Sequence, residues 1–181
     1  METSPTLVEP LVALIRDVKD FPHKGIVFKD ITPLLRDPAG LSMAVELLTQ
    51  PFRDKKVDVV AGAESRGFIF GTAVARNLSA GSVPIRKPGK LPAEVHSAKY
   101  ELEYGVDSIE IHADAVDTGQ RVLMVDDLLA TGGTMAACCE LVEGLGGTIV
   151  GVAFLLELAF LNGRDKLAKY PLHTVIRVEE P

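Results

Sequence analysis

The sequence lacks tryptophan and contains only two cysteines and four histidines among its 181 residues. The cysteines, Cys138 and Cys139, are neighbours whose side chains would point about 100° apart on a helix, with no other cysteine to pair with. We therefore expect small packing residues rather than a disulfide framework or a redox pair. The histidines are scattered without H-E-x-x-H spacing, which gives no support to a structural zinc site.

Long apolar runs, excess positive charge and the common nucleotide-binding loops are also missing. The longest apolar run, residues 149–156, is too short to span a bilayer, and a net charge of −6 disfavours a nucleic-acid or anionic-membrane surface. The first residues, METSP, lack the basic and apolar parts of a secretory signal, which predicts a cytoplasmic protein. No G-x-x-x-x-G-K-[ST] loop occurs, and the nearest approach to G-x-G-x-x-G, at Gly144 and Gly146, ends in Ile149.

What is present is an alternation of strand and helix patterns, which we expect to form a single domain over residues 1–181. A hydrophobic content of 47% without a low-complexity linker suffices for one core. Apolar residues at helical spacing predict a first helix over residues 7–18, and Asp37-Pro38 predicts the start of a second helix that stops at Pro51. Right-handed βαβ connections would order the remaining patterns into an α/β fold with a mainly parallel central sheet flanked by helices. The predicted strands are 57–60, 83–86, 121–125, 148–156 and 173–178, and the predicted crossover helices are 68–78 and 135–145.

Residues 87–115 interrupt this alternation because they contain no crossover-helix pattern. Residues 108–112 alternate as a half-exposed strand does. A long insertion within a compact domain is typical of a functional lid, and a plain surface β-hairpin is the alternative.

The most informative stretch is VLMVDDLLATGGT, residues 122–134. Its apolar start is typical of a central parallel strand, and Asp126 and Asp127 fall at the carboxyl end, where open α/β sheets bind ligands. A helix is predicted to begin near Thr134, and its free N–H groups together with a glycine turn form an anion cradle. The cradle residues indicated by this pattern are Thr131, Gly132, Gly133 and Thr134.

The two aspartates indicate what kind of anion belongs there. Two carboxylates beside a phosphate cradle would repel a bare phosphate, whereas a ribose diol can donate hydrogen bonds to them and Mg²⁺ can bridge carboxylate, water and phosphate oxygens. The pattern therefore predicts a phosphorylated sugar. An ordinary strand-turn-helix, with the aspartates capping the helix, remains the alternative.

The same stretch resembles the phosphoribosyl-pyrophosphate signature of the type I phosphoribosyltransferases. Other blocks resemble the adenine-specific members of that family and follow the family's order across essentially the whole chain: Phe21-Pro22, GIVFKDI at 25–31, ESRGFIFG at 64–71, RKPGKLP at 86–92 and LEYG at 102–105. The resemblance implies the type I fold with a mobile lid loop, and transfer of the 5-phosphoribosyl group from phosphoribosyl pyrophosphate to adenine. AMP and pyrophosphate would be the products and Mg²⁺ the cofactor. It also implies a homodimer in which residues near Arg86 and Lys87 approach the partner's site.

By the same resemblance, Asp126 and Asp127 hold the ribose hydroxyls, and residues Ala130, Thr131, Gly132, Gly133 and Thr134 hold the 5′-phosphate. No direct metal ligand is assigned, although either aspartate could hold Mg²⁺ through water. Arg66 and Lys87 are the implied pyrophosphate donors, and Glu64-Ser65 matches a strained peptide of the family. Solvated surface cations are the alternative for Arg66 and Lys87.

The resemblance places the purine between Phe28 and Leu158, with backbone groups of Val27 and Lys29 reading its edge. Many family members carry arginine where this chain has Lys29, a departure of little consequence if only the main chain reads the base. Core packing is the alternative role for Phe28 and Leu158. Glu103 matches the family's candidate acid/base on the lid, and a solvated loop glutamate is its alternative.

Three other functions compete with this interpretation. The first is a phosphoribosyltransferase for hypoxanthine and guanine or for xanthine, against which the segment around Phe28 argues. The second is a regulator that senses phosphoribosyl pyrophosphate and binds DNA, for which no spare N-terminal domain or basic recognition helix is evident. A generic nucleotide-binding module is the third.

Overall fold

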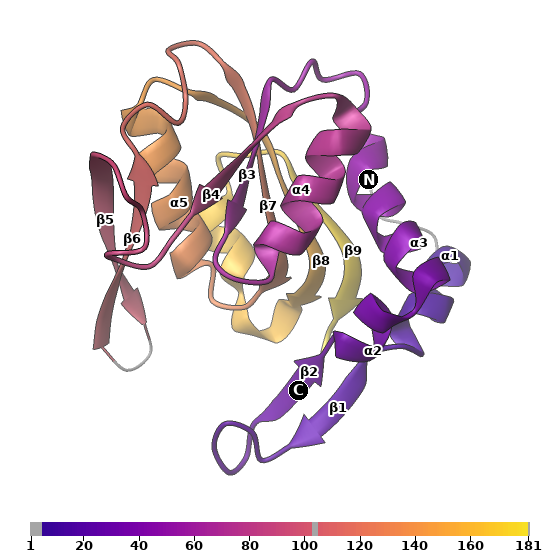
Figure 1. Cartoon of the computed structure of the whole chain (residues 1–181). Coiled ribbons are helices and arrows are strands. Elements are labelled where there is room, and N and C mark those ends of the chain that lie inside the picture. Colours follow the sequence, from indigo (N-terminus) through magenta and orange to yellow (C-terminus); the bar gives the residue numbers. More distant parts are fainter. Residues whose placement is uncertain (1–4, 103–104, 181) are drawn as a thin grey trace.

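A five-stranded parallel sheet forms the centre of the computed structural model, which describes residues 5–102 and 105–180 (Figure 1). The strand order is β4-β3-β7-β8-β9, and every neighbouring pair is parallel. The predicted α/β class is therefore confirmed. The bounds are β3 (Val59–Ala63), β4 (Gly81–Ile85), β7 (Arg121–Leu129), β8 (Thr148–Leu158) and β9 (Leu172–Val178).

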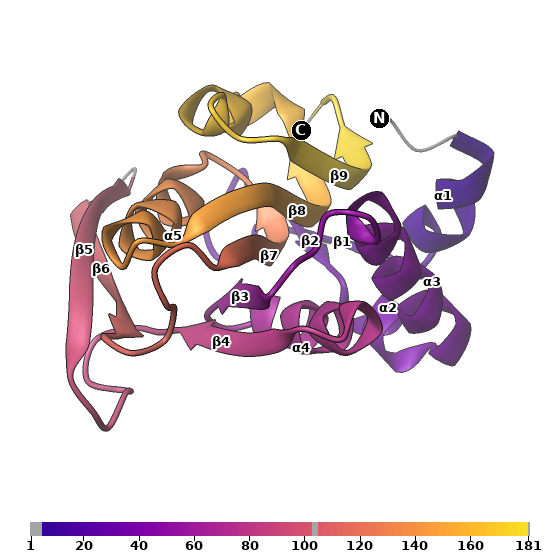
Figure 2. The same ribbon diagram turned by 90° about the horizontal axis from the view of Figure 1, so that it is seen from above.

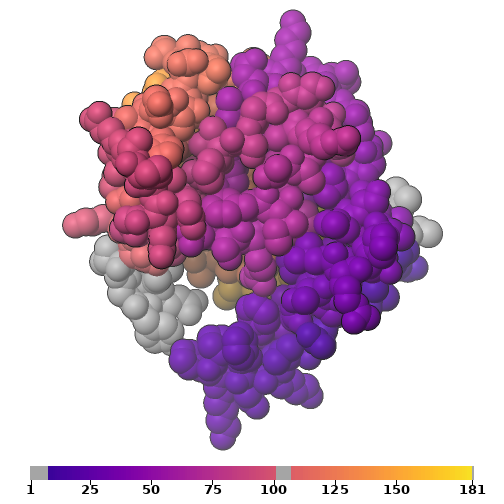
Figure 3. All heavy atoms as spheres, viewed as in Figure 1, coloured from indigo at the N-terminus to yellow at the C-terminus, as the bar shows by residue number. Residues whose placement is uncertain are grey.

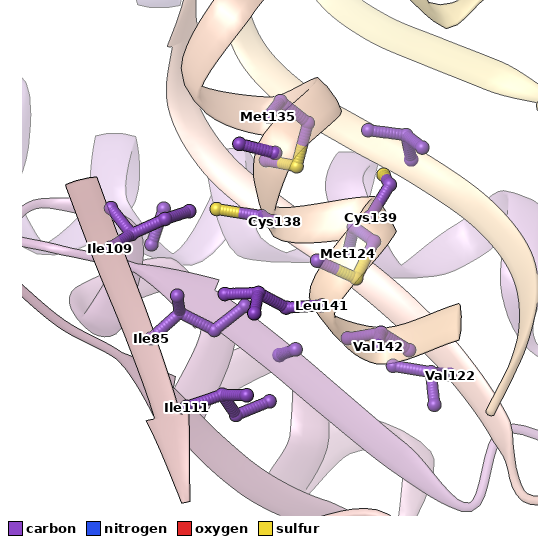
Figure 4. Close-up of a cluster of buried hydrophobic side chains, with 14 of the residues drawn as sticks. Ile85, Ile109, Ile111, Val122, Met124, Met135, Cys138, Cys139, Leu141 and Val142 are labelled. Carbon is purple, nitrogen blue, oxygen red and sulfur yellow. The ribbon is translucent and has the colours of Figure 1, made fainter. Parts of the chain in front are cut away.

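Helices cover both faces of this sheet, as the view along its edge shows (Figure 2). Helices α3 (Pro38–Thr49) and α4 (Gly67–Leu78) lie on one face, and α5 (Gly133–Gly144) lies on the other. Successive strand residues face opposite ways, so Met124 packs beneath α5 whereas Leu123 packs with the helices of the other face. Figure 4 shows Met124 within the first of these two cores. Burial on both faces of the sheet therefore explains why its central strands are continuous apolar runs, as the prediction assumed.

The second predicted helix is confirmed as α3. Asp37 caps it by accepting a hydrogen bond from the Gly40 N–H at 2.7 Å, and Pro38 occupies its first turn. The short elements around it and after β8 were not predicted: α2 (Thr32–Arg36) and the 3₁₀ turns η1 (Gln50–Phe52), η2 (Ala159–Leu161) and η3 (Gly163–Leu167).

The first predicted helix was wrong in its second half. Helix α1 (Pro5–Val12) ends early, and residues 16–19 form β1 (Arg16–Lys19), which pairs antiparallel with β2 (Val27–Asp30). Val18 lies opposite Phe28 in this hairpin. Its spacing from the preceding apolar residues fits a helix equally well, so the pairing of Val18 with Phe28, ten residues further along the chain, decided the outcome.

The insertion forms an antiparallel hairpin of β5 (Val95–Leu102) and β6 (Gly105–His112), and the strand predicted at 108–112 is confirmed. Ile109 and Ile111 are buried against α5, where Figure 4 shows them facing Cys138 and Leu141. The base of the hairpin is therefore part of the core, and the lid movement stays a prediction.

The β1–β2 hairpin lies beyond the carboxyl ends of β8 and β9 (Figure 1). The surface is hollowed between this hairpin and the body of the molecule (Figure 3). None of the helices in the described ranges is both long and apolar enough to cross a membrane.

Candidate active site

Strand β7 carries Asp126 and Asp127 to the carboxyl end of the central sheet. It runs on to Leu129, beyond the predicted end at 125, so Asp126 and Asp127 lie within the strand and Asp126 pairs with Phe154 of β8. Asp127 is only 7% exposed. The chain then turns through Gly132, whose left-handed φ of 77° suits glycine, and α5 begins at Gly133. The predicted strand, turn and helix are present in that order.

The turn packs against the backbone of η3. A Cβ added to Gly132 would lie 2.4 Å from the Gly163 carbonyl oxygen, and one added to Gly163 would lie 2.2 Å from the Ala130 carbonyl oxygen. Neither position has room for a side chain. Gly163 therefore supports the turn from behind, a role that no local pattern in the sequence indicated.

A cavity of about 210 Å³ opens in front of the same turn. The first residues of α5 border it on one side, and Arg66, the residue that precedes α4, borders it on another. Helix N-termini carry unpaired N–H groups and partial positive charge, which are suited to binding an anion. The polar or loop residues that line it are Glu64, Arg66, Asp126, Asp127, Ala130, Thr131, Gly132, Gly133 and Thr134.

The aspartates and Arg66 form one electrostatic unit. Arg66 Nε lies 2.8 Å from Asp127 Oδ2, and the Asp127 N–H donates to Asp126 Oδ1 at 2.9 Å. Burial, and then the negative charge of Asp127, raise the pKa of Asp126 well above its usual range. Burial also raises the pKa of Asp127, against the opposing effect of Arg66. Ligand hydroxyl groups or a cation would favour the ionised carboxylates, which then accept hydrogen bonds.

The carboxylates also suit a Mg²⁺ ion that enters the site together with a phosphorylated ligand. Within the described residues, no three His, Cys, Asp or Glu side chains gather closely enough to hold a metal by themselves. Asp126 and Asp127 are oxygen donors beside an anion cradle, and Mg²⁺ is commonly held by one or two carboxylates, water and substrate phosphates. The donor set thus suits an ion brought in with a phosphorylated ligand.

Glu64 joins two loops at the rim of the cavity. Its Oε2 accepts hydrogen bonds from the Lys87 N–H at 2.9 Å and from Arg86 Nε at 3.2 Å. The hydrogen bond from Lys87 lowers the pKa of Glu64, which keeps it ionised. The peptide between Glu64 and Ser65 is cis, at the position where the resemblance implies an unusual bond. This bridging role of the glutamate was not predicted.

Lys87 faces the β5–β6 hairpin instead of the cavity. Its Nζ bonds to the Tyr100 hydroxyl at 2.8 Å and to the carboxylate of Asp107. Burial opposes a rise in the Lys87 pKa, but the hydrogen bonds with Asp107 and Tyr100 outweigh it. Lys87 is not among the described residues that line the cavity, and its contact with pyrophosphate stays a prediction.

The predicted base-binding residues come from two elements. The Phe28 ring meets Phe21 edge-on with 5.2 Å between centroids, and the Arg66 guanidinium carbon lies 5.3 Å from the Phe28 centroid. Arg66 therefore touches both the predicted base site and Asp127. Leu158 ends β8, and its packing on a purine opposite Phe28 stays a prediction.

Lys29 Nζ forms an ion pair with Asp17 at 2.9 Å, across the hairpin. This pairing engages the side chain and leaves the main chain of β2 as the part of Lys29 available to a base. Glu103 lies outside the described residues.

Residues 31–178 match the family model described as a phosphoribosyl transferase domain. The chain belongs to the phosphoribosyltransferase family. The adenine phosphoribosyltransferase of Rhodopirellula baltica is 56% identical over 162 residues, which cover 90% of this chain and 79% of that protein. The adenine phosphoribosyltransferase of Nitrosococcus oceani is 53% identical over 93% of this chain and 99% of its own length.

Solved structures of the family agree with the fold. The crystal structure of adenine phosphoribosyltransferase from Thermoanaerobacter pseudethanolicus superposes with a TM-score of 0.92 at 53% identity, covering 94% of this chain and 99% of that one. The Saccharomyces cerevisiae enzyme, solved with adenine and an imino-altritol bisphosphate, gives 0.89 at 40% identity, covering 94% and 99%. The type I fold that the resemblance implied is thereby confirmed.

Proposed function

We propose that this phosphoribosyltransferase transfers the 5-phosphoribosyl group from phosphoribosyl pyrophosphate to adenine, forming AMP and pyrophosphate in purine salvage. The observation that carries the proposal is that Asp126 and Asp127 and the N-terminus of α5 line one and the same cavity. A sugar diol and a phosphate on one ligand match these two surfaces. Relatives that share about half of this sequence over most of its length are named for this reaction.

Each part of the ligand has a counterpart in the chain. The aspartates accept hydrogen bonds from the ribose hydroxyls, and residues 130–134 donate backbone and hydroxyl hydrogen bonds to the 5′-phosphate. Arg66 keeps donors free beyond the one facing Asp127, and these stabilise the departing pyrophosphate together with Lys87. When bound, Mg²⁺ would neutralise the pyrophosphate charge, and Asp126 or Asp127 would hold it through water.

Adenine would pack between Phe28 and Leu158, and the main chain of Val27 and Lys29 would read its edge. Among the described residues β2 pairs only with β1, so its other edge keeps backbone donors and acceptors available. A 6-oxopurine would present the opposite polarity there and leave buried groups unpaired. Glu103 would exchange a proton with the imidazole edge of the purine.

The decisive assay offers adenine, hypoxanthine, guanine and xanthine separately, each with phosphoribosyl pyrophosphate and Mg²⁺. Chromatography and mass spectrometry then identify the nucleotide. We expect AMP from adenine, and loss of the reaction when a chelator removes the metal. Product from a 6-oxopurine alone would reassign the base, and no nucleotide from any base would overturn the proposal.

We also propose a homodimer that uses the side of the sheet where β4 lies. Strand β4 is an edge strand, and a shallow hollow of about 360 Å³ lies beside it, with Phe68, Val83 and Pro84 in its lining. Ile69 on the adjacent helix is 44% exposed. Sedimentation equilibrium would measure the mass, and a monomer at micromolar concentration would refute the dimer. The cytoplasmic location expected from the sequence stays a prediction.

A further inference from the structure

An ion pair between the partly exposed Arg164 and the buried Glu157 lies behind residues 130–132, which we call the phosphate turn, and outside the cavity. Arg164 donates to both carboxylate oxygens of Glu157, with Nε at 2.6 Å and Nη2 at 2.7 Å. Thr174 completes the group, since its hydroxyl accepts from Arg164 at 2.9 Å and donates to Glu157 at 3.0 Å. The Glu157 side chain is only 3% exposed. Burial opposes ionisation of Glu157, but Arg164 and Thr174 outweigh it and lower its pKa.

The Glu157–Arg164 pair joins the two ends of a short loop, and this loop also contacts the phosphate turn. Glu157 belongs to β8 and Arg164 belongs to η3, so their hydrogen bonds fix η3 against the central sheet. Gly163 directly precedes Arg164, and its backbone is the surface on which Ala130 and Gly132 rest. Restraint of Arg164 is therefore passed through one peptide unit to the turn that faces the cavity.

A purely stabilising role explains this arrangement poorly. Glu157 loses its hydration on burial, and this cost offsets much of the stability that the pair with the 37% exposed Arg164 contributes. What a two-pronged pair provides is a defined geometry, because the guanidinium fork fits a carboxylate in one orientation. A cradle of backbone N–H groups needs such definition, since small displacements weaken its hydrogen bonds with a phosphate.

We propose that Glu157 and Arg164 are positioning residues for the 5′-phosphate cradle, acting through Gly163 on residues 130–132. The inference rests on the proposed function, because it assigns these residues to the binding of that substrate's 5′-phosphate. None of Glu157, Arg164 and Thr174 is among the described residues that line the cavity. Their effect on binding would therefore be indirect.

Two variants test the linkage from opposite ends. Arg164→Lys keeps the charge but loses the fork, and Gly163→Ala keeps the pair but places a methyl group 2.2 Å from the Ala130 carbonyl oxygen. Arg53→Lys is the matched control, because Arg53, which directly follows η1, makes a similar 2.6 Å pair with Glu46 of α3, and both of these side chains are exposed. Isothermal titration calorimetry with phosphoribosyl pyrophosphate and Mg²⁺, in the absence of a purine base, measures the Kd of each variant. The titration is run at a temperature well below that variant's Tm.

We expect Arg164→Lys and Gly163→Ala to raise Kd at least about tenfold, and Arg53→Lys to leave it within about twofold. Hydrogen exchange of residues 130–134 in the ligand-free protein should also accelerate in the first two variants and not in the control. If Arg164→Lys does not fold, Thr174→Val leaves both charged partners in place, removes only the hydroxyl that bonds to them, and should raise Kd at least about threefold.

A lowered Tm with unchanged Kd and unchanged exchange at 130–134 would overturn the inference and leave a structural role. In that case the wild-type protein still forms AMP, so the proposed function stands. A wild-type protein that neither binds phosphoribosyl pyrophosphate nor forms AMP overturns the proposed function, and the inference with it.

Discussion

Asp127 combines near-complete burial with an ion pair to Arg66. Because its carboxylate would accept hydrogen bonds from the ribose, Asp127→Asn should lower kcat/KM for phosphoribosyl pyrophosphate at least about tenfold, a loss of about 1.4 kcal/mol in transition-state stabilisation. Steady-state kinetics measure the change. Asp54→Asn, at an exposed position away from the cavity, is the control and should have wild-type kinetics. Unchanged kinetics for Asp127→Asn would contradict the assignment.

Asp126 yields a prediction for stability against pH. Its raised pKa means that the folded chain holds this proton to a higher pH than the unfolded chain does. The stabilising contribution is complete below the ordinary value of 3.8 and is lost as the pH rises toward the folded-state pKa. Asparagine cannot ionise, so Asp126→Asn should raise the Tm of the ligand-free protein near pH 7, and the gain should vanish near pH 4. Thermal melts across this range measure it.

Asp30 is the control of opposite sign for that measurement. Hydrogen bonds from the hydroxyl and N–H of Thr32, with a further one from Arg16, lower its pKa to about 2. Its contribution is present above 3.8 and is lost as the pH falls toward 2. Asp30→Asn should therefore lower the Tm near pH 7. Shifts of the same sign in both variants would show that amide substitution, and not ionisation, sets the stability.

At the scale of elements, the β5–β6 hairpin is the unit that would connect closure with chemistry. It is anchored by buried isoleucines and by the contacts of Lys87 with Asp107 and Tyr100, and Glu103 falls between its two strands in the sequence. If Glu103 supplies the acid/base group, Glu103→Gln should lower kcat at least about a hundredfold with little change in Tm. A kcat within about threefold of wild type would assign the proton transfer elsewhere.

The elements also show where sequence patterns succeed. The α3 cap was predictable because Asp37-Pro38 is a local signal, and strand β7 was predictable because an apolar run before paired aspartates is contiguous. The β1–β2 hairpin was missed because residues up to Val18 satisfy a helical period as well as a strand. Glu157, a charge inside an apolar strand run, was the one available sign of the pair with Arg164.

For the whole molecule, the core beneath α5 determines thiol reactivity. Cys138 and Cys139 are fully buried, and they pack as small residues as predicted. Figure 4 shows both among the side chains of this core. Burial raises the pKa of Cys139 to about 12 and that of Cys138 well above its usual range. Because the thiolate is the reactive form, neither should react with Ellman's reagent in the native protein near pH 8, and both should react in guanidinium chloride. Rapid native labelling of either thiol would contradict this packing.

The sequence by itself determined the α/β class, most of the sheet and helix positions, and the paired aspartates with the glycine turn. These features depend on neighbouring residues, so their periodicity or order is visible along the chain. Only the tertiary structure decided that Lys87 faces Asp107, that Arg66 lies between Phe28 and Asp127, and that Gly163 supports the phosphate turn. These contacts join residues that are far apart in the chain. Only the folding of the chain brings their charges and backbones together, so the local spacing of residues could not predict them.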